Sequence, residues 1–159
     1  EWLVTFKKFM AIFLLLTSLW LINLLIKLET KIETNINNYS SLEIVNWDIN
    51  KNFSLPNQLA AKGEIVFVDI TADWCLTCQV NKALVLDTKK ISEIFNSNNV
   101  KVLVLDWTKP NENIKNFLTK KGRYGIPYNE IYGPFLLNGK ILSELLTIKE
   151  IQTYINKAK

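Results

Sequence analysis

Histidine is absent from this chain of 159 residues, and cysteine occurs only twice. Without histidine the chain cannot form a Cys–His nucleophile pair, a histidine proton shuttle or a histidine-ligated metal site. Because Cys75 and Cys78 are close neighbours in the sequence, a framework of structural disulfides between distant segments is excluded as well. Many classes of enzyme are thereby removed, and the remaining chemistry centres on one cysteine pair.

A strong excess of charge of either sign is also missing. The chain has 19 Lys and Arg residues against 15 Asp and Glu residues, for a net charge of +4. Nucleic-acid binding would need a basic stripe interleaved with aromatic residues, whereas the basic residues of this sequence are scattered. We therefore expect a mildly basic, solvated surface and no nucleic acid among the partners.

The N-terminal part of the chain is far more apolar than the rest. The 18 residues of Phe9–Ile26 carry no charge, and as a helix they span about 27 Å, close to the hydrocarbon thickness of a bilayer. Lys7, Lys8 and Lys27 flank the segment on both sides, so the charge rule does not decide its orientation. A cleaved signal peptide is the alternative, but no small-residue cleavage site follows. We predict one transmembrane helix over residues 9–26, held in the lipid bilayer.

The rest of the chain divides into a connecting segment and a domain. Residues 1–8 are expected to be juxtamembrane, and the polar, Asn-rich residues 27–41 lack helical or strand periodicity, which favours a polar tether. Residues 42–159 suffice for one folded domain. Since the chain begins with Glu1 and not with Met, we expect further membrane helices upstream in a longer protein.

Strand and helix patterns alternate within the domain, which predicts an α/β fold built on βαβ units. The two long apolar runs predict buried strands, and Asn138-Gly139 predicts a hairpin turn. The expected strands are residues 65–71, 100–106, 129–132 and 135–137 with 141–145 beyond, and the expected helices are residues 55–62, 75–86, 90–96, 114–121 and 148–157.

The cysteine pair follows the first buried strand directly, in the stretch ADWCLTC, where a helix is expected to begin. Free backbone N–H groups and the helix dipole at that end stabilise negative charge, and lower the pKa of the Cys75 thiol below the ~8.5 of an ordinary thiol. Cys78 lies one turn further on the same helix face, so it can attack a mixed disulfide at Cys75 and release the reduced partner. The spacing predicts a nucleophilic Cys75, a resolving Cys78 and dithiol/disulfide exchange.

Other uses of a Cys-x-x-Cys pair fit this sequence poorly. A tetrahedral zinc site needs four ligands, and the chain offers no further cysteine and no histidine to complete one. Attachment of c-type haem needs a histidine after the second cysteine, where this chain has Gln79. We expect no metal and no cofactor other than the redox-active disulfide itself. Two buried, inert thiols are the structural alternative.

Two residues distant from the pair fit the same mechanism. Asp69 is the only charged residue in the apolar strand, so its carboxyl is expected to be desolvated, with a raised pKa, and able to accept the Cys78 proton. A strand-end residue that reaches solvent is the alternative for Asp69. Pro127 precedes a strand, and a cis Ile126–Pro127 bond would leave the backbone of Ile126 free to pair with an extended segment of a partner. Ile126 is therefore the expected substrate-binding residue.

Three segments carry a resemblance to a known family: VFVDITADWCLTCQVN around the cysteines, LDWT at Leu105–Thr108 and GRYGIP at Gly122–Pro127. They resemble the C-terminal domain of the DsbD thiol:disulfide interchange proteins, including their ScsB-like relatives. The resemblance covers roughly residues 42–159, and the apolar segment before them resembles the last helix of that family's transmembrane domain. It implies a thioredoxin-like fold, with a central mixed sheet flanked by helices.

The resemblance also implies a direction of electron flow. A domain in the periplasm, anchored to the bacterial inner membrane, would take electrons from an upstream membrane-embedded donor domain and reduce oxidised periplasmic thioredoxin-fold proteins. Carried over, Cys75 and Cys78 are the exchanging pair and Asp69 is the buried acid beside them. Pro127 is the cis-proline facing the active site, and Trp74 packs at its edge.

Two positions depart from the family pattern. Lys82 stands where the family often has an acidic residue that helps to keep thiol pKa values high, which leaves the redox poise open. Tyr128-Asn129-Glu130 is more polar than the apolar strand expected after the proline.

Other functions are compatible with the same residues. One is a reductase anchored by a single helix that serves cytochrome c maturation, for which a starting Met just upstream is expected. Another is a non-catalytic, peptide-binding thioredoxin-like module, in which Cys75→Ser would be harmless. An oxidase would run the same exchange in reverse, but Leu76-Thr77 between the cysteines contains neither His nor Pro, which favours a reducing pair.

Overall fold

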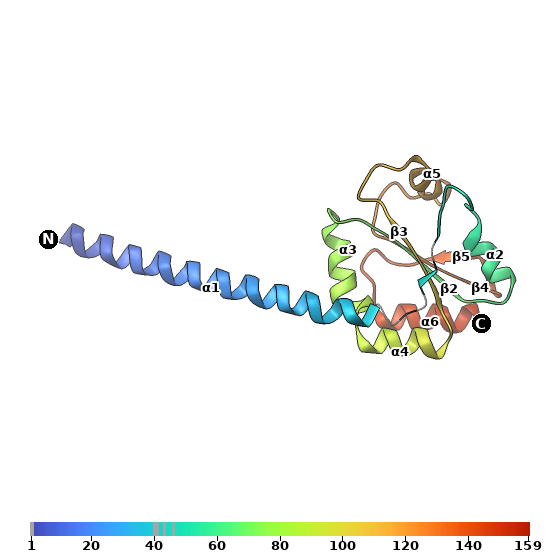
Figure 1. Cartoon of the computed structure of the whole chain (residues 1–159), viewed down its shortest axis with the longest axis horizontal. Coiled ribbons are helices and arrows are strands. Elements are labelled where there is room, and N and C mark those ends of the chain that lie inside the picture. The colour runs from blue at the N-terminus through green and yellow to red at the C-terminus, as the bar shows by residue number, and fades with distance from the viewer. Residues whose placement is uncertain (1, 40–41, 43, 46) are drawn as a thin grey trace. The chain divides into compact units, whose positions relative to one another are not determined.

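The computed structural model describes residues 2–39, 42, 44–45 and 47–159 of the chain, shown in Figure 1. The chain divides into two compact units, residues 1–36 and residues 37–159. The first unit is helical, and the second holds the sheet and both cysteines.

Helix α1 (Trp2–Tyr39) contains the apolar segment. Within it, the 18 residues of Phe6–Asn23 have a mean hydropathy of 1.5 and are long and apolar enough to cross a membrane. The predicted span over residues 9–26 overlaps this window and begins three residues later. The segment predicted as a tether without regular structure is helical as far as Tyr39, while residues 40–41 lie outside the described residues. No Pro or Gly interrupts the segment, so a helix that has formed in the apolar part can propagate through it.

The second unit is built on a five-stranded mixed sheet with the strand order β1-β3-β2-β4-β5. Strands β1, β3 and β2 are parallel, whereas β4 pairs antiparallel with β2, and β5 pairs antiparallel with β4. The strands are β1 (Ile44–Val45), β2 (Val66–Thr71), β3 (Lys101–Asp106), β4 (Tyr128–Gly133) and β5 (Leu136–Ile141). The predicted thioredoxin-like fold with a central mixed sheet flanked by helices is confirmed.

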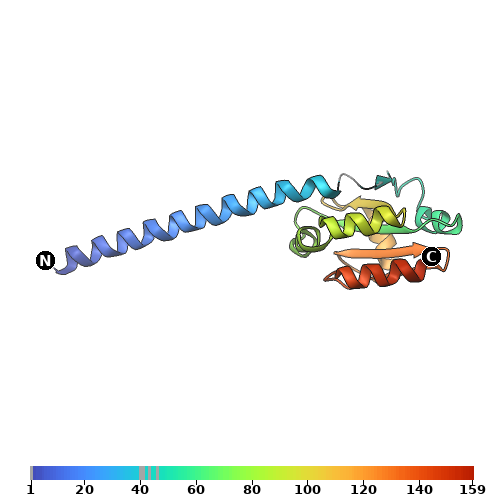
Figure 2. The same ribbon diagram turned by 90° about the horizontal axis from the view of Figure 1, so that it is seen from below.

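Helices cover both faces of this sheet. On one face α4 (Lys89–Ser97) and α6 (Ile148–Ala158) lie side by side, as Figures 1 and 2 show, and bury Phe95 and Ile155 in one core with Phe67 of β2. On the other face α2 (Leu55–Ala61) and α5 (Glu112–Lys120) pack over Val68 and its neighbours in a second core. Strand β2 is buried along its whole length, which explains its continuous apolar run.

The helix that carries the cysteines has two parts. Helix α3 (Leu76–Asn81) is α-helical and continues as one π-helical turn, η1 (Lys82–Leu86), so the helix predicted over residues 75–86 changes its winding halfway. The turn brings the backbone N–H of Asp87 to the carbonyl oxygen of Lys82 at 2.9 Å. Such π-helical turns frequently occur at functional sites.

The hairpin prediction at Asn138-Gly139 is wrong. The chain reverses between β4 and β5 at Pro134-Phe135, and Asn138-Gly139 lie inside β5. Gly139 has a φ of +76°, and a Cβ there would overlap the Glu130 carboxylate. This glycine therefore provides space for a buried side chain of the neighbouring strand.

Candidate active site

Cys75 and Cys78 are joined by a disulfide at the start of α3, with their Cα atoms 5.2 Å apart. Cys75 is the N-cap residue of α3, and its Sγ accepts a hydrogen bond of 3.2 Å from the backbone N–H of Cys78. Their exposed fractions are 5% and 3%, so both are largely shielded from solvent. When the disulfide is reduced, this N–H donor is positioned to stabilise a thiolate at Cys75.

The loop before the cysteines is held by the end of β3. Thr108 accepts a hydrogen bond of 3.0 Å at its Oγ1 from the backbone N–H of Asp73, and the N–H of Trp107 donates to the carbonyl oxygen of Thr71 at 2.7 Å. The rings of Trp74 and Trp107 lie against each other with their centroids 6.5 Å apart. The LDWT segment thus fixes the geometry of the cysteine loop.

Ile126 and Pro127 lie next to the pair. The side chain of Ile126 packs against a small cluster formed by Ala72, Cys75 and Cys78. The Ile126–Pro127 peptide bond is cis. The GRYGIP segment therefore approaches the active-site helix, although it follows the cysteines by about fifty residues of chain.

Asp69 lies in β2, buried to an exposed fraction of 3%, so the alternative of a solvent-facing strand end is wrong. Its Oδ1 accepts a hydrogen bond of 2.9 Å from the side-chain amide of Asn129, the residue directly opposite it on β4. Burial raises the pKa of Asp87 to about 6, an effect that Lys82 opposes and Asp69 reinforces. Asp69 therefore lies within electrostatic reach of a second acid, Asp87, which directly follows η1.

The polar residues after Pro127 serve opposite faces of the sheet. Asn129 reaches Asp69, whereas Glu130 lies on the other face, where its Oε2 accepts hydrogen bonds from the hydroxyls of Tyr128 and Tyr132 at 2.5 and 2.6 Å. Its Oε1 accepts a hydrogen bond of 2.8 Å from Lys121 Nζ. Burial together with the neighbouring Glu130 raises the pKa of both tyrosines. The unexpected polar residues of this strand are thus buried side chains that form hydrogen bonds.

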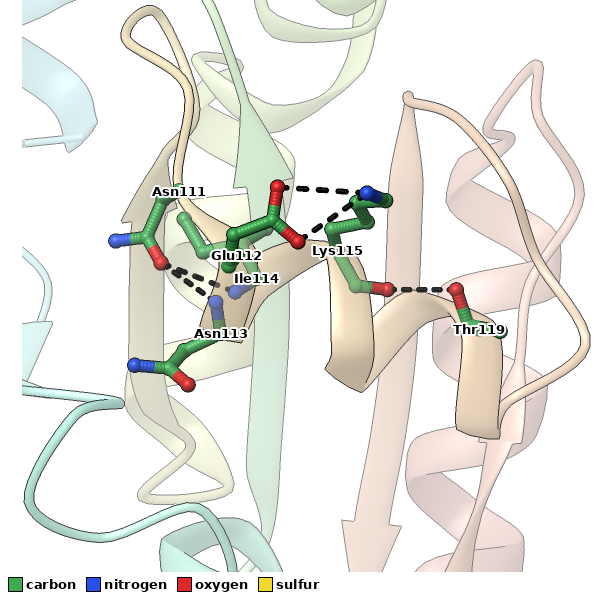
Figure 3. Close-up of polar contacts among 6 residues, drawn as sticks. All are labelled: Asn111, Glu112, Asn113, Ile114, Lys115 and Thr119. Carbon is green, nitrogen blue, oxygen red and sulfur yellow. Dashed lines mark hydrogen bonds and ion pairs between the residues drawn. The ribbon is translucent and has the colours of Figure 1, made fainter.

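A shallow pocket of about 240 Å³ opens beside the two tryptophans, and the first turn of α5 forms its wall. Figure 3 shows Asn111 accepting hydrogen bonds at Oδ1 from the backbone N–H groups of Asn113 and Ile114, which caps the helix. Glu112 and Lys115 form an ion pair of 3.2 Å on the same turn. Because of this cap, α5 begins two residues before its predicted start.

Sequence reasoning named the cysteines, Asp69, Trp74, Ile126 and Pro127, and it missed two contributors. These are Trp107, which the sequence marks only within the family resemblance, and Asn129, for which the sequence pattern predicts no role. The sequence does offer one signal for Asn129. It is a polar residue in a strand, two positions before the apolar Ile131, and therefore on the same face of the sheet as Ile131. Within the described residues no group of three His, Cys, Asp or Glu side chains could hold a metal ion.

Comparisons with known proteins agree with this geometry. The thioredoxin-like family matches residues 54–134, whereas no curated protein matches the sequence. The C-terminal domain of DsbD from Neisseria meningitidis aligns in its oxidised form with a TM-score of 0.53 and 15% identity, over 70% of this chain and 97% of that one. The same domain in its reduced form aligns with a TM-score of 0.51 and 16% identity, over 72% of this chain and 100% of that one. Thioredoxin O2 from Arabidopsis thaliana aligns with a TM-score of 0.52 and 15% identity, over 74% of this chain and 96% of that one.

These structural likenesses concern the fold, since the identities are low. The thioredoxin-like fold with a disulfide between Cys75 and Cys78 supports thiol–disulfide oxidoreductase activity in general. The family match spans about half of the chain, from the helix before β2 to the end of β4, and includes both cysteines. The chain belongs to the thioredoxin-like family.

Proposed function

We propose that this chain is a membrane-anchored protein-disulfide reductase that passes electrons from a membrane-embedded dithiol donor to oxidised periplasmic proteins. The observation that carries the proposal is the Cys75–Cys78 disulfide at the start of α3, with the Cys78 N–H donating to Cys75 Sγ. A helix start supplies the field that a reactive thiolate needs.

The exchange runs in two steps. In the reduced protein the Cys75 thiolate attacks one sulfur of a partner disulfide, so a mixed disulfide forms and the other partner sulfur leaves as a thiolate. Cys78 then loses its proton and attacks Cys75 Sγ, which closes the intramolecular disulfide and releases the second partner thiolate. Two electrons pass to the partner, whose two thiolates take up protons. The donor dithiol reduces Cys75–Cys78 again by the same reaction in reverse.

The surface around the pair fits a protein substrate. Trp74 and Leu76, on either side of Cys75, are exposed to 62% and 79%, although they are large and apolar. Ile126 lies against the pair and lines a further pocket with Tyr124 and Pro127. Apolar surface around a reactive sulfur favours a partner that presents its disulfide on a protein surface.

The anchoring and the direction of electron flow rest on two supports. Helix α1 contains a stretch long and apolar enough to cross a membrane, which would keep the domain near a membrane-embedded donor. The likeness to the DsbD C-terminal domain, solved in a reduced and in an oxidised form, is in keeping with cycling between the two states.

The reduction potential tests the direction. The whole chain, in detergent micelles, is equilibrated with defined ratios of reduced and oxidised glutathione or dithiothreitol, and the free thiols are counted. A value between about −200 and −270 mV, or below, supports electron delivery to periplasmic disulfides. A value near −120 mV overturns the reductive assignment and indicates disulfide formation. A Cys78→Ser variant, which cannot close the disulfide, is the control for titration of a single thiol.

A further inference from the structure

Asn129 occupies a position that an apolar side chain would fill by default. It lies on β4 between Tyr128 and Glu130 and shares its face of the sheet with Ile131, a residue of the core under α4 and α6. Its exposed fraction is 3%. A buried amide is costly unless it is hydrogen-bonded, so its partner indicates what the residue does.

That partner is the candidate proton acceptor. Asn129 and Asp69 are directly opposite on antiparallel strands, and the amide donates to the Asp69 Oδ1 at 2.9 Å. The backbone of Asn129 is fixed as well, because its carbonyl oxygen accepts a hydrogen bond of 2.9 Å from the N–H of Leu142. The amide therefore meets the carboxylate from a rigid strand that begins immediately after Pro127.

Asp69 lies close to the cysteine pair along the chain. It lies two residues before the end of β2, and the chain runs from that end directly into the cysteine loop. The residue opposite it on β3 is the apolar Val104. Two further charged residues, Lys82 on η1 and Asp87 just beyond it, lie in this region, and the Asp87 carboxyl is influenced by both Lys82 and Asp69.

We propose that Asn129 is a positioning residue: its amide holds the Asp69 carboxylate ionised and oriented to take the proton from Cys78 as that thiol attacks Cys75. The inference rests on the proposed function. In this step the Cys78 S–H proton passes to Asp69, the Cys78–Cys75 bond forms, and the bond from Cys75 to the partner sulfur breaks, releasing a thiolate. An amide N–H that donates to a carboxylate favours its ionised form. If the Asn129 amide is removed, the Asp69 carboxyl therefore ionises, and becomes able to accept a proton, only at higher pH.

The test isolates the closing step. Reduced protein, as the whole chain in detergent, reacts with an aromatic disulfide reagent whose released thiolate is coloured. The first release reports attack by Cys75, and the second reports attack by Cys78. In Asn129→Leu we expect the second release to slow about tenfold near pH 7 and its pH dependence to move up by about one unit, from the loss of one charged hydrogen bond. The first release should be nearly unchanged.

Two variants separate this role from a structural one. Glu130→Gln alters the adjacent buried residue, which faces the other side of the same strand, so it is expected to weaken the fold without moving the pH dependence of closure. In an Asp69→Asn background, Asn129→Leu should have little further effect, because the residue acts through Asp69. If Asn129→Leu does not fold, Asn129→Ser, which shortens the side chain, is measured in its place.

Each outcome decides the proposal. A closing rate and pH profile like those of the unmodified chain overturn it, as does equal slowing by Asn129→Leu with and without Asp69. The proposed function fails separately, since the reagent needs no physiological partner: a chain that closes its disulfide normally yet reduces no protein disulfide would contradict the function alone.

Discussion

Replacing Asp87 by Asn should stabilise the folded domain near neutral pH and make its stability less sensitive to pH. The carboxyl of Asp87 has a folded-state pKa of about 6, raised by burial from the 3.8 of a free aspartate, and the nearby Asp69 adds to the shift while Lys82 opposes it. Above about pH 6 the group is ionised in both states, so the folded protein bears the whole cost of the buried charge. Below about pH 4 it is protonated in both states and the cost disappears.

The size of the effect follows from this shift. A difference of about two pH units corresponds to about 3 kcal/mol as an upper limit, because each unit is worth about 1.4 kcal/mol. Partial solvent screening, together with the contacts of the carboxylate that an amide does not reproduce, reduces this to about 1–2 kcal/mol. The melting temperature near pH 7 should therefore rise by about 3–8 °C in Asp87→Asn, and the gain should vanish near pH 4.

Tryptophan fluorescence gives the readout. Of the five tryptophans, Trp47, Trp74 and Trp107 lie in the domain, and Trp47 is buried in the core under α5, so the change in total emission on heating reports unfolding of the domain. Asp106→Asn is the matched control of opposite sign, because hydrogen bonds from the side chain and backbone of Thr108 lower the pKa of Asp106. That variant should lose stability near pH 7 and little near pH 3. If Asp87→Asn melts at or below the temperature of the unmodified chain near pH 7, the assignment of a buried, costly charge is refuted.

Further substitutions test the site and its supports. In Cys78→Ser the mixed disulfide between Cys75 and a partner cannot be resolved, so it should accumulate and appear as a larger species on a non-reducing gel; its absence would argue against a nucleophilic Cys75. Lys121→Met leaves the buried Glu130 carboxylate without its cation and should cost about 3 kcal/mol or more, read from the denaturation midpoint. Gly139→Ala should cost about 1–3 kcal/mol, because the residue has positive φ and its new Cβ would overlap the Glu130 carboxylate.

Gly122→Ala is the control for the last of these substitutions. Gly122 also has a positive φ, of +70°, but a Cβ there meets no atom within 4 Å. It therefore carries the backbone cost alone and should lose less stability than Gly139→Ala. Equal losses would show that the space beside Glu130 is not what the glycine of β5 provides.

The fold was accessible from the sequence where the physics is local. The apolar runs of β2 and β3 have the length and continuity of strands buried on both faces. The cysteine pair follows β2 directly, and Cys75 is the N-cap of the helix that begins there. The apolar pattern predicts a start of α5 at Ile114, whereas the cap at Asn111 lets the helix begin at Glu112.

The missed features depend on residues far apart in the chain. The sequence predicts a turn at Asn138-Gly139 because Asn-Gly between apolar runs is a strong hairpin signal, yet here the glycine makes room for Glu130 on the paired strand. Likewise, nothing local connects Asn129 with Asp69, which precedes it by 60 residues. Such pairs become visible only when the strand register is known.

The alternation of polar partners along β4 has a consequence for folding specificity. A slip of β4 by one residue would turn Asn129 away from Asp69 and bring Glu130 beneath the cysteine helix, next to Asp69 and Asp87. Lys121 would then lose its carboxylate, and three acids would share one apolar core. Apolar side chains alone tolerate such shifts far better than buried charges do. The polar residues after Pro127 thus make one alignment of the central strands far more stable than its neighbours, and select the arrangement in which the active site is assembled.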